Sequence, residues 1–516
     1  KWLEDLIKVT EKKTDLYGDH KGSWQGLNKP TLSEEGMRAT VEIHNEEITN
    51  LKNEDEKIYT EITNLNEDIA IEKNRMNTVG INRVVPLPSN ISLPFTIIHN
   101  NGYKAYFGEV EGIIKQAKKI YISSFIRGTG LGEEAKEAIT LNRFKYNFTN
   151  NLYPGINKFR LIFIDKFYFA EGNDLTIDSE NIHISFESGC GFTWLGYAKT
   201  DGIKTSTSWA LEDGIGVIEQ TKEHNIQTLV NMENLDVNGM PLLYRKVSSL
   251  ASCKAEKGTF YQEGVKIYCN KLDLHDYKRM IMLPNAACIN IRQTGEKIYS
   301  FKNMGFMGVS LNLLPKNLNT RIYLDGCKFF RGSTDGFKID GKYKVFLKDC
   351  VSAYPSKDCF NYHSTSKDSI AVEINCKGYG AGQYKFTNTN VDDASNNGST
   401  AHNGMIILRF GSSYWNCQGA IVADIENCYS INYDVTCKDI LPTTGIRASF
   451  RITNDESSVR YRDELVNKYI INCYGGGTNT EYGIYGDEYT KVYGFSGNYN
   501  YYGNVDIKKE EFLNYE

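Results

Sequence analysis

Between residues 297 and 473 one short phrase recurs, a strand of alternating apolar residues that ends in Asn, Asp or Gly followed by Cys. The copies are IYLDGC ending at Cys327, VFLKDC at Cys350, VEINC at Cys376, VADIENC at Cys428 and IINC at Cys473. The first two steps between these cysteines are 23 and 26 residues, and the third, of 52 residues, is twice 26. A strand that returns about every 25 residues is typical of a solenoid.

We therefore predict a mostly β fold, a right-handed parallel β-helix over residues 91–478. The thiols would stack as a buried ladder, and the Asn or Asp beside each thiol would occupy a tight turn. Helical repeats of this length would show a period of about 3.6 residues, which these segments lack. A β-sandwich with coincidental spacing is the alternative, but its strands recur about every 8–12 residues without a shared phrase. The 34 Tyr and 24 Phe beside only 10 Pro also favour strands.

Composition limits the partners and cofactors. The chain has 12 cysteines but no CxxC pair, which argues against zinc and thioredoxin-like sites and favours reduced, buried thiols. No repeated calcium loop is visible, so we expect neither a metal nor another cofactor. The net charge of −5 disfavours nucleic acid as a partner. No apolar run is long enough to span a membrane, and the first residues lack the apolar core of a signal peptide.

Residues 41–80 predict a coiled coil, because apolar residues recur there at alternating steps of three and four. Isoleucine occupies both apolar positions of the heptad: Ile48, Ile62 and Ile69 are on one and Ile58 is on the other. This mixture favours a coiled coil of three or four helices over one of two. A single amphipathic helix lying on a globular core would show a wider apolar stripe. We expect residues 1–40 to form an attachment segment and residues 81–90 a short linker.

Within the body we expect an early helix over 108–119. Residues 203–250 interrupt the strand texture and predict an insertion, with helical and loop character over 211–224. Residues 479–516 are expected to close the solenoid or to pack a trimer, since an open end would expose unpaired backbone groups.

Two aspartates are candidates for acid–base chemistry. Asp335 and Asp358 are 23 residues apart, the same step as between Cys327 and Cys350. They should therefore stack on neighbouring coils about 5 Å apart, where two carboxylates take different pKa values and supply an acid and a base. Such a spacing suits glycoside hydrolysis. The plainer interpretation is that each Asp caps a turn.

Other polar and aromatic residues follow closely. We predict that His363 and His402, with Asp392 and Asp393, carry protons or hold a saccharide; alternatively this loop is a polar turn that His402 supports. Arg409 and the pair Tyr414 and Trp415 are predicted to bind sugar, because exposed aromatic faces stack on sugar rings. Trp415 is equally compatible with a place in the core. We predict that none of the candidate site residues binds a metal ion.

A trimer-forming coil followed by a parallel β-helix resembles the tailspike and tail-fibre proteins of tailed phages, which have a pectate-lyase-like body. The stretches 248–262 (SSLASCKAEKGTFYQ) and 392–404 (DDASNNGSTAHNG) resemble β-helical proteins in phages and prophages of Gram-positive bacteria. The resemblance implies a homotrimer in the virion tail that is attached to the tail or baseplate through its N-terminus. It also implies binding, and often cleavage, of a bacterial surface polysaccharide such as exopolysaccharide, capsule or teichoic acid.

The sequence therefore predicts a tailspike that depolymerises a cell-surface glycan, with hydrolysis favoured over elimination. Two alternatives stay open. One is a receptor-binding fibre of the same fold that adheres without cleaving. The other is a polysaccharide lyase, in which a base removes a proton beside a uronate carboxylate.

Overall fold

The computed structural model describes residues 83–508 apart from 86, 171–173, 179–181, 198–208, 221–222, 224–225, 227, 272–279, 284–288, 293, 309–310, 333, 385–394 and 455–464. The predicted attachment segment (1–40) and coiled coil (41–80) lie outside the described residues. Residues 83–516 form one compact unit. Within the described ranges, no helix is long and apolar enough to cross a membrane.

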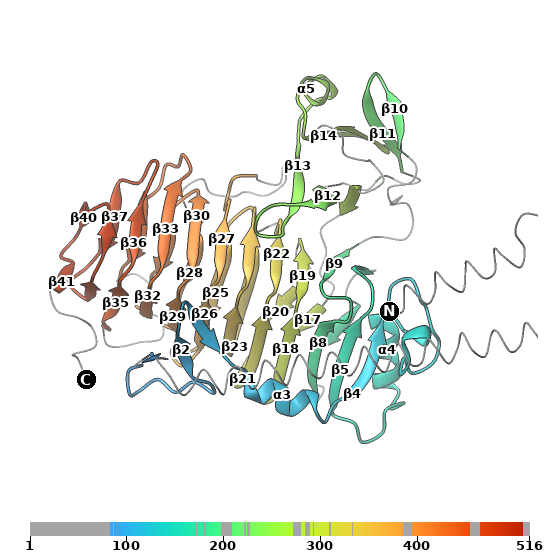
Figure 1. Cartoon of the computed structure of the whole chain (residues 1–516), viewed down its shortest axis with the longest axis horizontal. Coiled ribbons are helices and arrows are strands. Elements are labelled where there is room, and N and C mark those ends of the chain that lie inside the picture. The colour runs from blue at the N-terminus through green and yellow to red at the C-terminus, as the bar shows by residue number, and fades with distance from the viewer. Residues whose placement is uncertain are drawn as a thin grey trace, which may run out of the picture. The chain divides into compact units, whose positions relative to one another are not determined.

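The chain winds through three parallel sheets in turn (Figure 1). A representative coil consists of β25 (Phe360–Ser364) in the first sheet, β26 (Ile370–Ile374) in the second and β27 (Lys377–Tyr379) in the third. Each of these strands pairs in parallel with its counterpart one coil later. This is the arrangement of a parallel β-helix, so the predicted mostly β fold with long parallel sheets is confirmed. Its right-handed sense stays a prediction.

We call the three sheets I, II and III. Sheet I contains β7 (Leu175–Ile177), β17 (Ile289–Ile291), β20 (Leu311–Leu313), the first half of β23 (Phe337–Lys348), β25, β28 (Ser399–Ala401), β31 (Val422–Asp424), β34 (Ala448–Ile452), β37 (Tyr482–Gly486) and β40 (Tyr501–Tyr502). Sheet II contains β4 (Lys118–Ile122), β5 (Lys158–Phe163), β8 (His183–Ser188), β18 (Ile298–Lys302), β21 (Lys316–Asp325), the second half of β23, β26, β29 (Ile406–Phe410), β32 (Tyr429–Tyr433), β35 (Lys468–Ile471), β38 (Thr490–Tyr493) and β41 (Asp506–Lys508). Sheet III contains β6 (Phe167–Ala170), β9 (Thr193–Tyr197), β19 (Met304–Met307), β22 (Lys328–Phe330), β24 (Val351–Ala353), β27, β30 (Ser413–Cys417), β33 (Thr436–Ile440), β36 (Tyr474–Gly476) and β39 (Ser496–Gly497).

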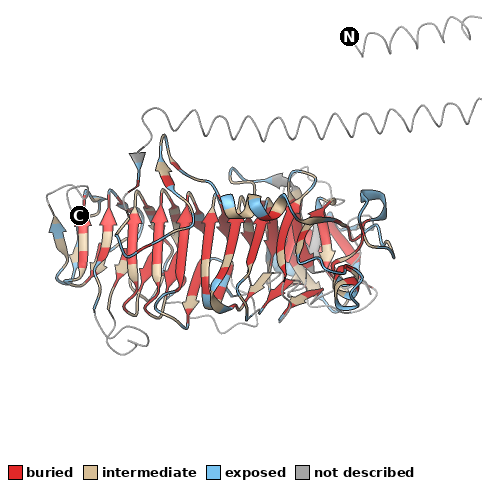
Figure 2. Cartoon of the chain, turned by 90° about the horizontal axis from the view of Figure 1, so that it is seen from below, coloured by how far each residue is buried: buried red, intermediate tan, exposed pale blue. Residues whose placement is uncertain are grey.

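The interior of the coils is filled by residues that stack in register. Ile322, Val345, Ala371 and Ile407 face one another on successive strands of sheet II, and all are fully buried. In Figure 2 the buried residues, drawn in red, extend along successive strands of the solenoid. Since side chains alternate between the two faces of a strand, this register also fixes which residues point outward.

In each coil from β18 onward, the turn between sheets II and III is made by one residue with left-handed backbone. The polar ones are Asn303, Asp349, Asn375, Asp434 and Asn472, with φ between 51° and 54°. Glycine takes the same place at Gly326, Gly411 and Gly494. Asn, Asp and Gly are the residues that tolerate this conformation at least cost. The predicted tight turn at an Asn or Asp is confirmed beside Cys350, Cys376 and Cys473, whereas Gly326 takes this place beside Cys327.

The cysteine ladder is shorter than the spacing predicted. Cys327, Cys350 and Cys376 directly follow this turn on successive coils and are fully buried. Cys473 occupies the same place, but Ser412 and Val435 stand there in the coils between. Cys428 is a misassignment, because it precedes β32 instead of following a strand of sheet II. The described cysteines are free thiols, and all except Cys190 are buried.

The N-terminal part of this unit covers the outer face of sheet II. It comprises β1 (Arg83–Val84), β2 (Ile97–His99), β3 (Tyr103–Ala105) and the predicted early helix, observed as α3 (Gly108–Ile114). Phe107 and Ile113 belong to one buried cluster with Tyr323, Phe346 and Leu408 of sheet II. The first residues of the predicted linker 81–90 thus include a strand. Farther on, η1 (Ala135–Glu137) and α4 (Leu141–Thr149) lie between β4 and β5.

The insertion is larger than expected and is built of strands. Its sheet contains β10 (Ala210–Glu212), β11 (Ile215–Glu219), β12 (Thr228–Leu235), β13 (Pro241–Lys246), β14 (Thr259–Glu263), β15 (Lys266–Asn270) and β16 (Met280–Leu283), with α5 (Leu250–Ala255) beside them. The predicted helical character over 211–224 is wrong, because Asp213 and Gly214 both have positive φ and join β10 to β11 in a tight hairpin. The insertion therefore extends well past residue 250.

The insertion also covers part of sheet III. Val230 and Met240 of the β12–β13 hairpin pack against Met307 and Phe330, and the Lys328 ammonium donates to the Gly239 carbonyl at 2.9 Å. At the C-terminal end, β37 to β41 continue the coils as far as Lys508. Residues 479–508 are thus part of the solenoid, which corrects the separate closing segment expected over 479–516.

The left-handed turn can be tested at Asn472, whose φ is 51°. Asn472→Gly should leave the free energy of unfolding nearly unchanged. Asn472→Val should lower it by about 1–2 kcal/mol, because a side chain branched at Cβ clashes in this conformation. Urea denaturation of both variants measures the difference, and equal midpoints would contradict the account of the turn.

Candidate functional site

Sheet I presents a polar outer face over β23, β25 and β28. Phe337 and Ile339 of β23 point into the interior cluster. Because side chains alternate along a strand, Lys338 and Asp340 point outward. Lys338 is in register with Asn361, which is in turn in register with Thr400. Amine, amide and hydroxyl groups thus follow one another along the axis on this face.

Asp335 and Asp358 lie in the turns that lead from sheet III into sheet I. They stand on neighbouring coils, as the 23-residue step predicts: the Gly336 amide donates to the Asp358 carbonyl at 2.8 Å. Oδ1 of Asp335 accepts from the Asp358 amide at 3.3 Å and from Nδ2 of Asn361 at 3.1 Å. Oδ1 of Asp358 accepts from the Asn397 amide at 2.7 Å.

Each aspartate therefore uses one oxygen to cap the next coil, as the plainer interpretation holds. The Asp358 carboxyl also has a side-chain hydrogen bond with Thr400. Both side chains belong to residues that are only 5% exposed. The pair thus consists of two nearly buried carboxyls on neighbouring coils that hydrogen bonds hold in place.

Burial changes the acidity of this pair. It raises the pKa of the Asp335 carboxyl. Burial, and after it the nearby charge of Asp335, raise the pKa of Asp358 well above its usual range. Two adjacent carboxyls that cannot both ionise easily are the arrangement from which an acid and a base arise. Asp358 is the one that keeps its proton more firmly.

The two histidines form a second cluster on the same face. The rings of His363 and His402 stack with centroids 4.3 Å apart and planes 5° apart. Nδ1 of His402 lies 3.7 Å from Oε1 of Glu426. Burial, and then the neighbouring His402, lower the pKa of His363 to about 3, so this ring is neutral at physiological pH.

The structure separates the histidines from the aspartate pair. His363 lies on β25, whereas Asp358 lies in the turn before this strand. The sequence grouped them as one cluster because they are close in the chain. It missed Glu426, although the coil step places that residue beside His402. Asp392 and Asp393 lie outside the described residues.

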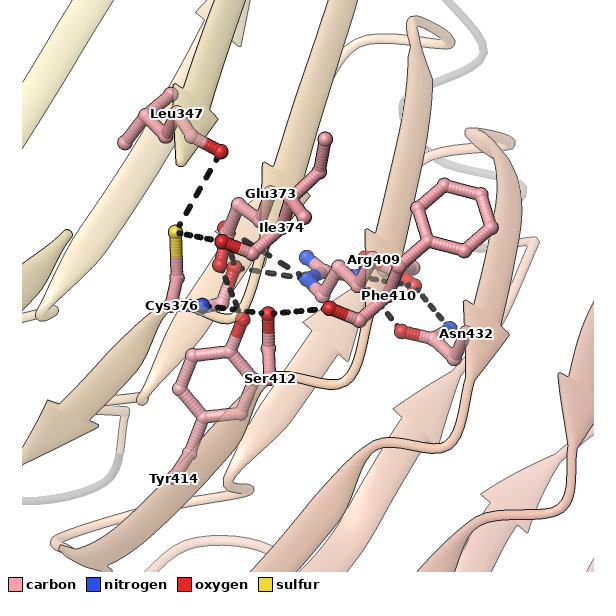
Figure 3. Close-up of polar contacts among 11 residues, drawn as sticks. Leu347, Glu373, Ile374, Cys376, Arg409, Phe410, Ser412, Tyr414 and Asn432 are labelled. Carbon is pink, nitrogen blue, oxygen red and sulfur yellow. Dashed lines mark hydrogen bonds and ion pairs between the residues drawn. The ribbon is translucent and has the colours of Figure 1, made fainter. Parts of the chain in front are cut away.

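Arg409 and Tyr414 do not face solvent, which corrects their predicted role in binding sugar. Both are fully buried inside the solenoid. Arg409 donates to Oδ1 and Oδ2 of Asp424 at 2.8 and 2.9 Å, and to Oδ1 of Asn432 at 3.0 Å. The Tyr414 hydroxyl donates to Glu373 (Figure 3).

The reason for this placement is the register of sheet II. Glu373, Arg409 and Asn432 face one another on β26, β29 and β32, and this row points into the interior. A buried guanidinium requires anionic partners, which Asp424 and Glu373 supply. Arg409 is therefore a structural residue of the interior.

Trp415 lies on the outer face of sheet III and is partly exposed. Its ring stacks on Tyr379, with centroids 4.6 Å apart and planes 8° apart. The Tyr379 hydroxyl donates to Asp236 of the insertion. Trp415 is thus neither fully in the core nor on the face that carries the aspartates. Among the described residues, no group of three His, Cys, Asp or Glu is placed to hold a metal ion.

No family model matches the chain, and no curated protein matches it. Among solved structures, a glycoside hydrolase aligns over 77% of this chain and 98% of its own, with 9% identity and a TM-score of 0.49. The pectate lyase Pel9A aligns over 76% and 77%, with 8% identity and a TM-score of 0.32. The receptor-binding tailspike of bacteriophage Det7 aligns over 79% of both chains, with 9% identity and a TM-score of 0.19. The fold assignment rests on the strand register of this chain.

The role of Arg409 can be tested by Arg409→Met. Removing the cation leaves Asp424 and Glu373 buried without compensation, so the free energy of unfolding should fall by about 3–5 kcal/mol. Arg447→Met is the matched control. Arg447 pairs with Glu481 at 2.8 Å on the surface, and its loss should cost no more than about 1 kcal/mol. Unchanged stability of Arg409→Met would contradict the structural role of Arg409.

A second test uses the raised pKa of Asp358. A carboxyl whose pKa is higher in the folded chain binds its proton more tightly there, so the free energy of unfolding falls as pH rises from about 3.9 through the folded pKa. Asp358→Asn removes this loss. Relative to the parent, the variant should gain stability between pH 4 and pH 7. Denaturation midpoints across this range measure the effect, with Asp368→Asn, an exposed aspartate, as the control. A variant that loses stability relative to the parent as pH rises would contradict the raised pKa.

Proposed function

We propose that this protein binds and depolymerises a polysaccharide along the outer face of sheet I, by hydrolysis at the Asp335–Asp358 pair. The observation that carries the proposal is this pair: two buried carboxyls on neighbouring coils, each held by a hydrogen bond from the backbone. Lys338, which is exposed on the outer face of sheet I, supplies a donor for sugar hydroxyls.

Each aspartate takes one role in this reaction. Protonated Asp358 donates its proton to the glycosidic oxygen as the bond to the anomeric carbon breaks. Ionised Asp335 attacks that carbon, and water then hydrolyses the resulting ester while Asp358 takes a proton from the water. Neighbouring parallel strands are about 4.8 Å apart, which matches the separation of about 5–5.5 Å in retaining glycosidases. The sugar product should therefore keep its anomeric configuration.

The oligomeric state, the attachment to a phage tail and the host glycan are also part of the proposal. The coil pattern over 41–80 supports a homotrimer attached to a phage tail, and the resemblance supports a surface glycan of a Gram-positive host, such as exopolysaccharide, capsule or teichoic acid. Trp415, Asp392, Asp393 and the two histidines stay proposed contacts of the polymer.

A receptor-binding fibre that does not cleave is the second candidate. It is favoured by the hydrogen bonds through which Oδ1 of each aspartate caps the next coil, since that role alone would explain why the residues are there. The lyase mechanism is separated from both by its unsaturated product.

The proposal is tested with Asp335→Asn and Asp358→Asn. Each should lower the rate of polymer cleavage by at least about 100-fold, because a proton donor or nucleophile is lost, while polymer binding persists. The purified protein is incubated with wall and capsular polymers of Gram-positive bacteria, and new reducing ends and ultraviolet absorbance are followed. Asp368→Asn is the control that should keep full activity.

Three other results would redirect the account. Full activity of both variants would remove the aspartates from the chemistry. Product with the absorbance of an unsaturated sugar would mean a lyase. Binding without any shortening of the polymer would mean an adhesive fibre.

A further inference from the structure

One row of outward side chains runs along sheet I away from the aspartate pair. On successive strands from β25 to β40 it consists of Asn361, Thr400, Ala423, Arg451, Tyr485 and Tyr502. Nδ2 of Asn361 donates to Oδ1 of Asp335 at 3.1 Å, so the row begins at the aspartates. With about 4.8 Å for each strand, it extends about 24 Å from Asn361 to Tyr502.

The far end of the row is aromatic. The rings of Tyr485 and Tyr502 stack with centroids 4.2 Å apart and planes 8° apart. Tyr482 meets both rings edge-on, at 5.9 and 5.7 Å. Tyr502 is 49% exposed. We call these three residues the tyrosine platform.

The platform is not needed to fill the interior. Ile484 of β37 is fully buried in the interior cluster, and Tyr501 of β40 packs against that cluster. Tyr485 and Tyr502, the next residue on each strand, therefore point to the opposite face. Because these rings do not contribute to the interior, their presence on the outer face needs another explanation.

The accessible part of the row is its aromatic end. Asn361, Thr400 and Ala423 are only 6%, 1% and 2% exposed, and Asn361 and Thr400 hydrogen-bond to Asp335 and Asn397. Tyrosine combines an apolar ring with a polar hydroxyl, which suits a ligand that has both apolar CH faces and hydroxyl groups.

We propose that the tyrosine platform is a distal subsite for a sugar ring of the same polymer that is cleaved at Asp335 and Asp358. This inference rests on the proposed function, because it takes the polymer to lie along sheet I. The chain of the ligand would then run parallel to the solenoid axis, with its cleavage point and its distal contact about 24 Å apart.

The proposal makes binding depend on the length of the ligand. A fragment of two sugars at the aspartates cannot reach the platform, whereas a fragment of six or more can. The test compares these two sizes, prepared from the wall and capsular polysaccharides used to screen activity. The full chain with Asp358→Asn serves as the parent, so that fragments stay intact.

Tyr485→Ala and Tyr502→Ala in this parent should weaken binding of the long fragments about three- to tenfold and leave the short ones unchanged. Tyr485→Phe and Tyr502→Phe should keep most of the affinity. Tyr499→Ala is the matched control, because Tyr499 is 64% exposed in the same part of the chain but lies outside the row. Circular dichroism checks that each variant is folded.

The outcomes separate this inference from the proposed function. If the parent binds long fragments and the folded alanine variants bind them equally well, the platform is not a subsite, and the proposed function stands. If the parent binds no fragment of any size, both are rejected. If the alanine variants change the oligomeric state and not the affinity, the platform is a contact between copies of the chain, and the inference is overturned.

Discussion

The parallel hydrogen bonds between coils hold each side chain over its counterpart about 4.8 Å away, and the rest of the structure depends on this register. It packs Ile322, Val345, Ala371 and Ile407 into one interior column. A left-handed Asn, Asp or Gly in each coil from β18 onward keeps the register by turning the chain between sheets II and III at the same point. The same register places Asp335 and Asp358 on neighbouring coils, in the turns that lead into sheet I.

The outer faces have different surroundings. Sheet II is covered by the N-terminal strands and α3, and part of sheet III by the hairpin of the insertion. Sheet I carries amide, hydroxyl, imidazole and tyrosine side chains over many coils. A long polar face that repeats at the strand spacing is suited to a long, repeating ligand. The solenoid thereby relates the shape of the fold to the class of ligand that we propose.

Much of the fold could be predicted from the sequence, because strand alternation and the turn residues are local signals. The 23-residue step likewise placed Asp335 and Asp358 on neighbouring coils. It was harder to predict from the sequence where in its coil a residue lies and whether its side chain points inward or outward. Cys428 has the right spacing but the wrong place in its coil, and Arg409 points inward because β29 pairs with Glu373 of β26. The Asp213–Gly214 hairpin was visible in principle, as two adjacent turn residues between apolar runs.

The most direct test of the account is a crystal structure of Asp358→Asn with a long fragment of the polymer that the parent protein binds. We predict that the fragment lies on the outer face of sheet I, with a glycosidic oxygen within hydrogen-bonding distance of residue 358. A fragment bound on sheet III or on the insertion, away from Asp335 and residue 358, would contradict the central claim.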